Sequence, residues 1–165
     1  MSVLDSMVGV LEPWNTLYSG STALSVGMTF LHLGAMMVGG GLAIAADRAV
    51  LKVGAAPDQT TRLAVADAVG DVHRPVVACL LVSAVTGSLQ LAADLESLIG
   101  NKIMWVKFGL LASLALNGLL MLRDEREVRR GSGGAQAFGA LRVRAVTSVF
   151  LWLAIVLAGV GLLQG

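Results

Sequence analysis

The chain has 165 residues and a formal net charge of +1, and 56% of its residues are hydrophobic while only 14% are charged. Soluble domains carry about 25% charged residues, so this chain has too few charges to cover a surface exposed to water. The composition therefore argues against a soluble enzyme, a disordered segment and a nucleic-acid-binding protein, and it indicates an integral membrane protein.

The N-terminal segment predicts a short helix ahead of the first membrane span. Apolar residues recur there at helical spacing on one face, at Val3, Leu4, Met7, Val8 and Leu11. Trp14 and Tyr18 follow, and such aromatic side chains favour the boundary between lipid and water. We therefore expect a helix over residues 2–12 that lies on the outer membrane surface.

Four apolar stretches are long enough to cross a membrane. A helix needs about 20 apolar residues to span a hydrocarbon core of roughly 30 Å, and only a helix satisfies its own backbone polar groups in lipid. The stretches cover residues 22–46, 75–93, 103–122 and 145–163. With short links between them, they predict a single membrane domain over residues 1–165, an all-α, integral membrane four-helix bundle.

Lysine and arginine residues concentrate in two of the three links between the spans. The first link carries Arg48, Lys52, Arg62 and Arg74. The third link carries Arg123, Arg126, Arg129, Arg130, Arg142 and Arg144, whereas residues 1–46 contain neither lysine nor arginine. Because basic links remain in the cytoplasm, both of these links are predicted to be cytoplasmic and both termini to lie outside.

The two basic links also contain signals for helix ends. Asp58, after Pro57, is suited to cap a helix that begins near Gln59 and leads into the second span. The run Gly131-Ser-Gly-Gly134 predicts a break in the third link. Asp47 and Arg48, at the inner end of the first span, are predicted to pair with each other or with Arg74 at the membrane surface.

Polar residues inside the predicted spans are the best candidates for a functional site, because burying them in lipid is costly. Met28, His32 and Met36 are four residues apart and form one stripe along a helix. Thioether sulfur and imidazole nitrogen suit Cu(I), whereas imidazole alone suits the iron of a b-type haem. The structural alternative is that the methionines fill gaps in the bundle and His32 bonds to a neighbouring helix.

The second and third spans add polar residues at a similar depth. Thr86 and Gln90 lie on one face of the second span and would form a polar wall beside His32. Lys107 either extends to the membrane surface or points inward. An inward Lys107 would hold a haem propionate, a quinone oxygen or the carboxylate of Asp94.

The sequence contains no motif of a known catalytic site. It lacks the Gly-x-Ser-x-Gly, phosphate-loop, His-Glu-x-x-His and Cys-x-x-Cys patterns. No carboxylate falls inside the apolar part of a predicted span, which argues against a proton pump built on an Asp/Glu relay. The sequence thus favours a role without enzyme activity and predicts no catalytic residue.

Several of these segments resemble the copper-resistance protein D (CopD-like) membrane domain and related uncharacterised bacterial four-helix membrane families. The similar segments are Phe30-Leu-His32-Leu-Gly34, Gly39-Gly-Gly41, Thr86-Gly87-Ser-Leu-Gln90 and Trp105-Val-Lys-Phe-Gly-Leu-Leu-Ala, which contains Lys107. The resemblance covers about residues 24–123. It implies a protein of the bacterial inner membrane with a role in copper passage or handling. The single histidine at mid-membrane depth departs from a haem site that uses two histidines.

Three functions stay open on the sequence alone. The first is copper binding or passage near the outer leaflet through Met28, His32 and Met36. The second is an electron-transfer subunit with one b-type haem on His32, and the third is an accessory subunit of a larger membrane complex. The cofactor is accordingly copper, haem b or none. The expected partners are membrane lipid and either other membrane subunits or further copies of this chain.

Overall fold

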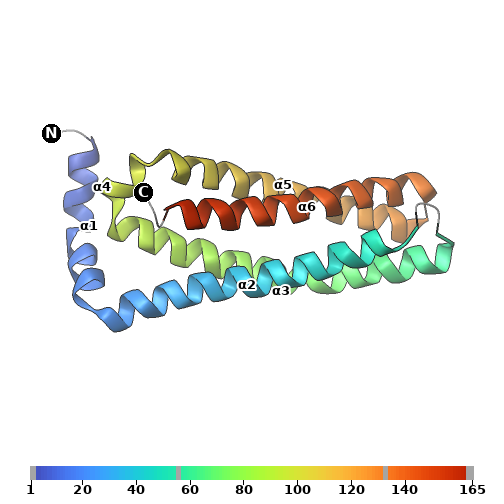
Figure 1. Ribbon diagram of the computed structural model, residues 1–165, viewed down its shortest axis with the longest axis horizontal. Coiled ribbons are helices and arrows are strands. Elements are labelled where there is room, and N and C mark those ends of the chain that lie inside the picture. The colour runs from blue at the N-terminus through green and yellow to red at the C-terminus, as the bar shows by residue number, and fades with distance from the viewer. Residues whose placement is uncertain (1–2, 55–56, 132–133, 163–165) are drawn as a thin grey trace.

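The computed structural model describes residues 3–54, 57–131 and 134–162, and these residues form helices without any strand. In chain order the helices are α1 (Val3–Gly20), α2 (Thr22–Lys52), α3 (Gln59–Ala93), α4 (Leu95–Ile99), α5 (Lys102–Arg130) and α6 (Gly134–Leu162) (Figure 1). Helices α2, α3, α5 and α6 are each long and apolar enough to cross a membrane. The prediction of an all-α chain with four such helices is therefore confirmed.

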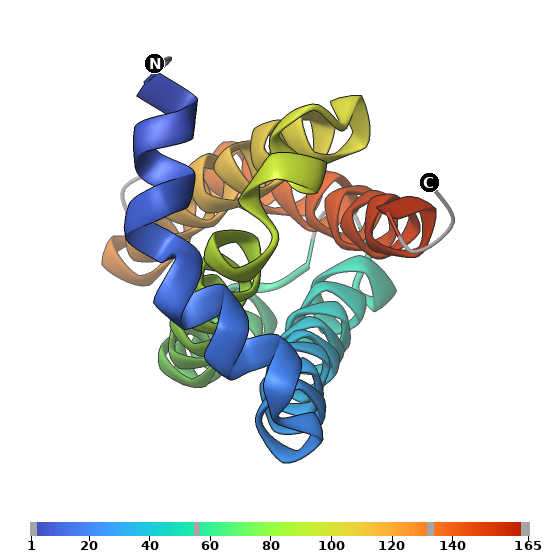
Figure 2. The same ribbon diagram turned by 90° about the vertical axis from the view of Figure 1, so that its left-hand side faces the viewer.

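The four long helices pack as two antiparallel pairs. α2 lies along α3, α5 lies along α6, and the contacts of α6 with α2 and of α3 with α5 join the pairs (Figures 1 and 2). α1 and the last turns of α6 lie at one end of the bundle, called here the α1 end. The two arginine-rich links lie at the opposite end, called here the basic end. The membrane side that each end faces stays a prediction.

The helices extend beyond the predicted spans at the basic end. α2 continues to Lys52, α3 begins at Gln59 and α5 continues to Arg130. The 35 residues of α3 span about 52 Å at 1.5 Å per residue, which exceeds a hydrocarbon core of roughly 30 Å. The predicted spans lie inside these helices except for residue 163, which is outside the described residues.

Side-chain caps begin three of the helices. Ser21 accepts a hydrogen bond from the amide of Leu24, Asp58 from that of Thr61, and Asn101 from that of Ile103. Such caps satisfy N–H groups that have no partner inside the helix. The predicted Asp58 cap is confirmed, and the hydrogen bonds from Thr61 lower the pKa of the Asp58 carboxyl.

Helix α1 lies across the end of the bundle and donates hydrogen bonds to carbonyl groups in the last turns of α3 (Figure 2). The Trp14 indole donates a hydrogen bond of 2.8 Å to the Leu89 carbonyl, and the Asn15 amide donates to the Ala93 carbonyl. The Ala93 carbonyl is one of those at the end of α3 that lack a partner within the helix. α1 is longer than the helix predicted over residues 2–12, and its position on a membrane surface stays a prediction.

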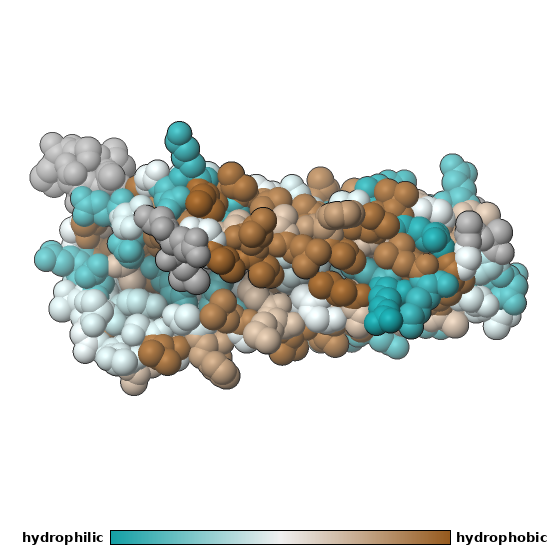
Figure 3. All heavy atoms as spheres, viewed as in Figure 1, coloured by the Kyte–Doolittle hydropathy of each residue, from teal (hydrophilic) through white to brown (hydrophobic). Residues whose placement is uncertain are grey.

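On the face drawn in Figure 3, apolar side chains cover the middle of the bundle and hydrophilic residues gather toward its two ends. Phe30, Phe150 and Leu157 are 73%, 69% and 73% exposed. Only 11% to 28% of the residues in the most apolar window of each long helix are buried within the protein. Because an apolar surface of this extent needs lipid around it, the structure supports a multi-pass membrane protein.

Ion pairs connect α5 to α3 in the part of the bundle that extends past the apolar middle. Arg129 of α5 reaches α3, where Nη1 lies 2.7 Å from Oδ1 of Asp67, and it also pairs with Glu125 on its own helix. Gly70 makes room for this arginine, because a Cβ atom at that position would lie 2.5 Å from Nη2 of Arg129. These pairs are partly exposed, so each contributes little to the stability.

Two adjacent glycines allow α2 to approach both of its neighbours. A Cβ atom at Gly39 would lie 2.8 Å from Cβ of Cys79 on α3, and one at Gly40 would lie 3.0 Å from the Trp152 ring of α6. Trp152 forms a buried apolar cluster with Leu114 and Ile155. The small residues thus bring α2 into contact with α3 and α6 at the centre of the bundle.

Replacing Gly39 by valine therefore destabilises the bundle, by about 1–3 kcal/mol if the strain resembles that of other overpacked cores. The measurement is the thermal unfolding midpoint of the detergent-purified protein. Gly41→Val is the matched control, because nothing lies within 4 Å of a Cβ atom at Gly41. Equal midpoints for the two variants would show that α2 does not approach α3 through Gly39.

Candidate functional site

His32 of α2 is anchored to α3 through one nitrogen of its ring. Nδ1 lies 2.9 Å from the Ser83 carbonyl oxygen and 3.3 Å from the Ser83 and Thr86 hydroxyl oxygens. Because a carbonyl oxygen only accepts hydrogen bonds, Nδ1 donates to Ser83, and the lone pair of a neutral ring is then on Nε2. Histidines that bind metals commonly have their second nitrogen fixed to a carbonyl or carboxylate in this way.

The imidazole of His32 rests on the backbone of α3 at Gly87. A Cβ atom at Gly87 would lie 2.9 Å from Cε1 of His32, closer than real Cβ contacts. Ser83 and Thr86, which precede Gly87 on the same helix, are each only 5% exposed. The Thr86-Gly87 pair therefore has a direct structural role, because it supplies a hydroxyl and the space that the ring occupies.

Gln90 lies on the same face of α3 as Thr86, one helical turn nearer to the α1 end. Its side-chain nitrogen Nε2 is buried and has no hydrogen-bond partner among the described residues. A buried donor without a partner costs about 1–3 kcal/mol, so this amide is suited to bind a water molecule or another acceptor. Thr86 and Gln90 are four residues apart in α3 and therefore lie on one face of this helix, while their role as a polar wall beside His32 stays a prediction.

Lys107 of α5 is half-buried and lies against α6. Its Nζ atom is 3.7 Å from the position that a Cβ atom would take at Gly159. Its charge is close enough to act on His32 electrostatically. Among the residues described, Lys107 forms no ion pair, so the alternative in which it binds Asp94 is not observed.

The two methionines of the predicted stripe are half-buried on α2. Met36 packs against the apolar cluster that contains Trp152. Met37, the next residue, is 77% exposed. Met28 and Met36 are thus less exposed than this neighbour, while the use of Met28, His32 and Met36 as metal ligands stays a prediction.

We use the name His32 cluster for the group of residues that these helices bring together toward the α1 end of the bundle. Its members are His32, Ser83, Thr86, Gly87, Gln90 and Lys107. The cluster offers one nitrogen lone pair, one unpartnered amide and one cation. In the described part of the chain, no three His, Cys, Asp or Glu side chains converge, so a site built from carboxylates or from several histidines has no support.

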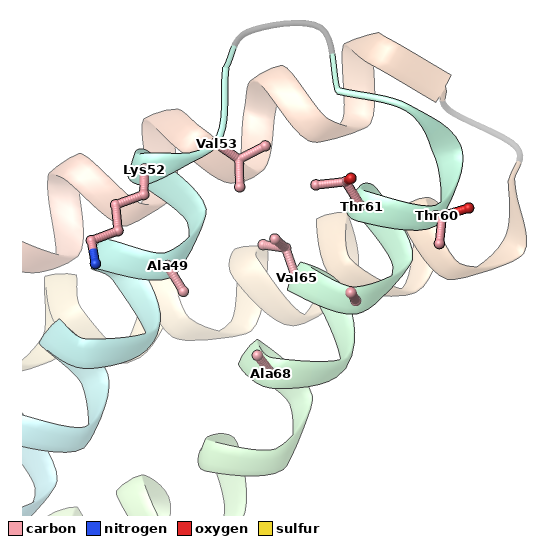
Figure 4. A pocket seen from close by; sticks show the side chains of 8 residues that line it. Ala49, Lys52, Val53, Thr60, Thr61, Val65 and Ala68 are labelled. Carbon is pink, nitrogen blue, oxygen red and sulfur yellow. The ribbon is translucent and has the colours of Figure 1, made fainter.

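An open groove of about 520 Å³ lies elsewhere, between α2 and α3 at the basic end (Figure 4). Small side chains such as Ala49, Ala68 and Thr61 line it, and Lys52 lies at its edge. No group of polar atoms converges on it. The groove is therefore separate from the His32 cluster and does not contribute to it.

Asp47 is a buried polar residue whose position the sequence did not predict. It is only 1% exposed, and the Ser148 hydroxyl of α6 hydrogen-bonds to its carboxyl group. The predicted pairing with Arg48 or Arg74 is wrong, because Asp47 points into the bundle and both arginines are exposed. The spacing of Asp47 from Gly40 and Val50, by seven and three residues, places it on the buried face of α2 and could have revealed this.

Comparisons with protein-family models, with curated proteins and with solved structures give no match to this chain. The resemblance to the copper-resistance protein D membrane domain accordingly stays a prediction.

The contact with Gly87 predicts that Gly87→Val displaces the His32 ring and breaks its hydrogen bond to Ser83. Nitrogen-15 NMR of histidine-labelled protein reports which ring nitrogen is protonated, and a chain with 2 histidines gives a simple spectrum. Gly118→Val is the matched control, because a Cβ atom there meets nothing within 4 Å. A His32 signal that is the same in wild type and Gly87→Val would contradict the described geometry.

Proposed function

We propose that this protein binds or passes Cu(I) in the bacterial inner membrane, with Nε2 of His32 as its central ligand. Both termini lie outside, which places His32 in the outer half of the membrane. The observation that carries the proposal is the 2.9 Å contact between Nδ1 of His32 and the Ser83 carbonyl. It fixes the ring so that the lone pair of Nε2 is available to a ligand.

The donor atoms near His32 fit a soft monovalent ion. Met28 and Met36 are one helical turn before and after His32, so their flexible side chains extend along the same face of α2. Imidazole and thioether ligands carry no charge and select soft metal ions over magnesium or calcium. The metal is the cargo of this protein, and the role of the chain is to hold it away from lipid and water.

The charge of Lys107 limits how tightly a cation binds in the His32 cluster. Two positive charges in a region of low dielectric constant repel each other more strongly than in water. A site that combines neutral ligands with a nearby ammonium group binds a cation weakly and releases it readily. This property favours passage of the ion over storage.

The proposal predicts copper binding that depends on the methionines of the inward stripe. His32→Ala abolishes near-stoichiometric Cu(I) binding, and Met28→Leu or Met36→Leu weakens it by at least about tenfold, equivalent to about 1.4 kcal/mol. The measurement is Cu(I) titration against a chromophoric competitor in detergent. Met37→Leu is the control, because Met37 is 77% exposed. Unchanged Cu(I) affinity in His32→Ala would refute the copper proposal. A Soret band in the purified wild type would refute it as well, because the band indicates bound haem.

The repulsion from Lys107 gives a second prediction. Lys107→Met removes the cation and raises the Cu(I) affinity roughly tenfold, because about 1.4 kcal/mol of repulsion is relieved. Lys102→Met is the control, since Lys102 is exposed at the start of α5. The same titration checks both variants, and a loss of Cu(I) affinity in Lys107→Met would contradict the repulsion, because Lys107 would then support the bound ion.

A second candidate function is that of an accessory subunit, and an open face of α2 favours it. Gly27, Gly34 and Gly41 are seven residues apart, and nothing lies within 4 Å of a Cβ atom at any of them. Small residues on an open face allow a further membrane helix to approach closely. Purification without copper or haem, but together with a larger membrane complex, would favour this function over copper handling.

A further inference from the structure

A second polar site lies inside the bundle toward the basic end, independent of the His32 cluster. Asp47 and His32 are both on α2, and at 1.5 Å per residue their positions are about 22 Å apart along the helix axis. Asp47 is one of the largest fully buried side chains of the protein. The copper proposal makes no use of it.

The Asp47 carboxyl group has an incomplete set of partners. The Ser148 hydroxyl is a hydrogen-bond donor to this group, whereas the oxygen Oδ2 is buried and has no partner among the described residues. Asp47 also takes no part in the ion pairs that these residues form. An ionised carboxylate would therefore be buried here without a compensating charge, which is strongly unfavourable.

The charged groups on the neighbouring helices are engaged elsewhere or exposed. On α6, Nε of Arg144 lies 3.5 Å from Oδ2 of Asp124, which belongs to α5. On α3, Asp71 and Arg74 are exposed. His73 of α3 interacts electrostatically with Glu125 and Arg126 of α5. Arg48, next to Asp47 on α2, is exposed as well.

Asn117 of α5 presents a second oxygen without a partner to the same part of α6. Asn117 is 5% exposed, and its amide nitrogen donates a hydrogen bond of 3.1 Å to the carbonyl of Arg144. Its oxygen Oδ1 is buried and has no partner in the described structure. Arg144 and Ser148 are one turn apart, so Asp47 and Asn117 pack against a single turn of α6 from α2 and α5.

Around this turn of α6, three buried oxygens have no hydrogen-bond partner among the described residues, and they belong to Asp47, Asn117 and Asp124. Among the residues described there, the one buried donor without a hydrogen-bond partner is Nε of Arg144, which lies 3.5 Å from Asp124 and forms no ion pair with Asp47. A proton on Asp47 removes the uncompensated charge and converts Oδ2 from an acceptor into an O–H donor. We propose that Asp47, supported by Ser148 and Asn117, is a proton-binding site inside the bundle, occupied under conditions in which exposed carboxylates are ionised. The ligand is a proton, and a bound alkali metal ion is the competing assignment that the experiment distinguishes.

The proposal is tested by infrared spectroscopy of the full-length protein in detergent at about pH 5.5, more than one unit above the ordinary values for Asp and Glu. The wild type is expected to show the carbonyl stretch of a protonated carboxyl group, with a shift in D2O. Asp47→Asn removes the band completely. Asp71→Asn, which changes an exposed acid on α3, leaves it intact.

A second variant keeps the test decisive if Asp47→Asn fails to fold. Ser148→Ala removes the donor to the carboxyl group and shifts the frequency of the band, whereas Ser113→Ala, at an exposed position of α5, does not. Absence of the band in the wild type, or the same band in Asp47→Asn, would overturn the proposal. Loss of the wild-type band when choline chloride is replaced by sodium chloride would also overturn it, because the site would then hold a metal ion.

Discussion

The absence of water from the hydrocarbon core is the constraint on which this structure depends, because a polar group there is stabilised only by partners inside the protein. Three contacts meet that requirement between helices. His32 bonds α2 to α3, Asp47 bonds α2 to Ser148 on α6, and Asn117 bonds α5 to α6. Together they link both helix pairs with directional bonds. Apolar packing in lipid does not supply this specificity, since lipid tails are as apolar as leucine.

The polar groups of the interior fall at two levels with a tightly packed layer between them. The His32 cluster lies toward the α1 end and the Asp47 site toward the basic end. Between them, Gly39 and Gly40 bring α2 against Cys79 and Trp152. The first level offers an imidazole lone pair and suits a soft metal ion. The second offers unpaired oxygens and suits a proton, so the chemistry of each level follows from the atoms that its helices leave without partners.

The sequence predicted the four apolar spans and the Asp58 cap because hydropathy and capping are local signals. It also predicted that a helix begins near Gln59 and leads into the second span, as α3 does. It did not predict that α2 continues to Lys52 and α5 to Arg130, because the apolar pattern ends before those residues. The burial of Asp47 was missed for a related reason. Its place near the end of an apolar stretch indicated a surface residue, although its spacing from Gly40 and Val50 places it on the face of α2 that the structure buries. The placement of Lys107 against Gly159 likewise depends on how α5 and α6 pack.

The central claim is that His32 and the methionines beside it form a soft-metal site, and X-ray absorption at the copper edge of the Cu(I)-loaded protein tests it most directly. The account predicts a first shell that contains both nitrogen and sulfur, with the nitrogen contribution lost in His32→Ala and sulfur reduced in Met28→Leu. A first shell without sulfur, or a spectrum that His32→Ala leaves unchanged, would contradict the account.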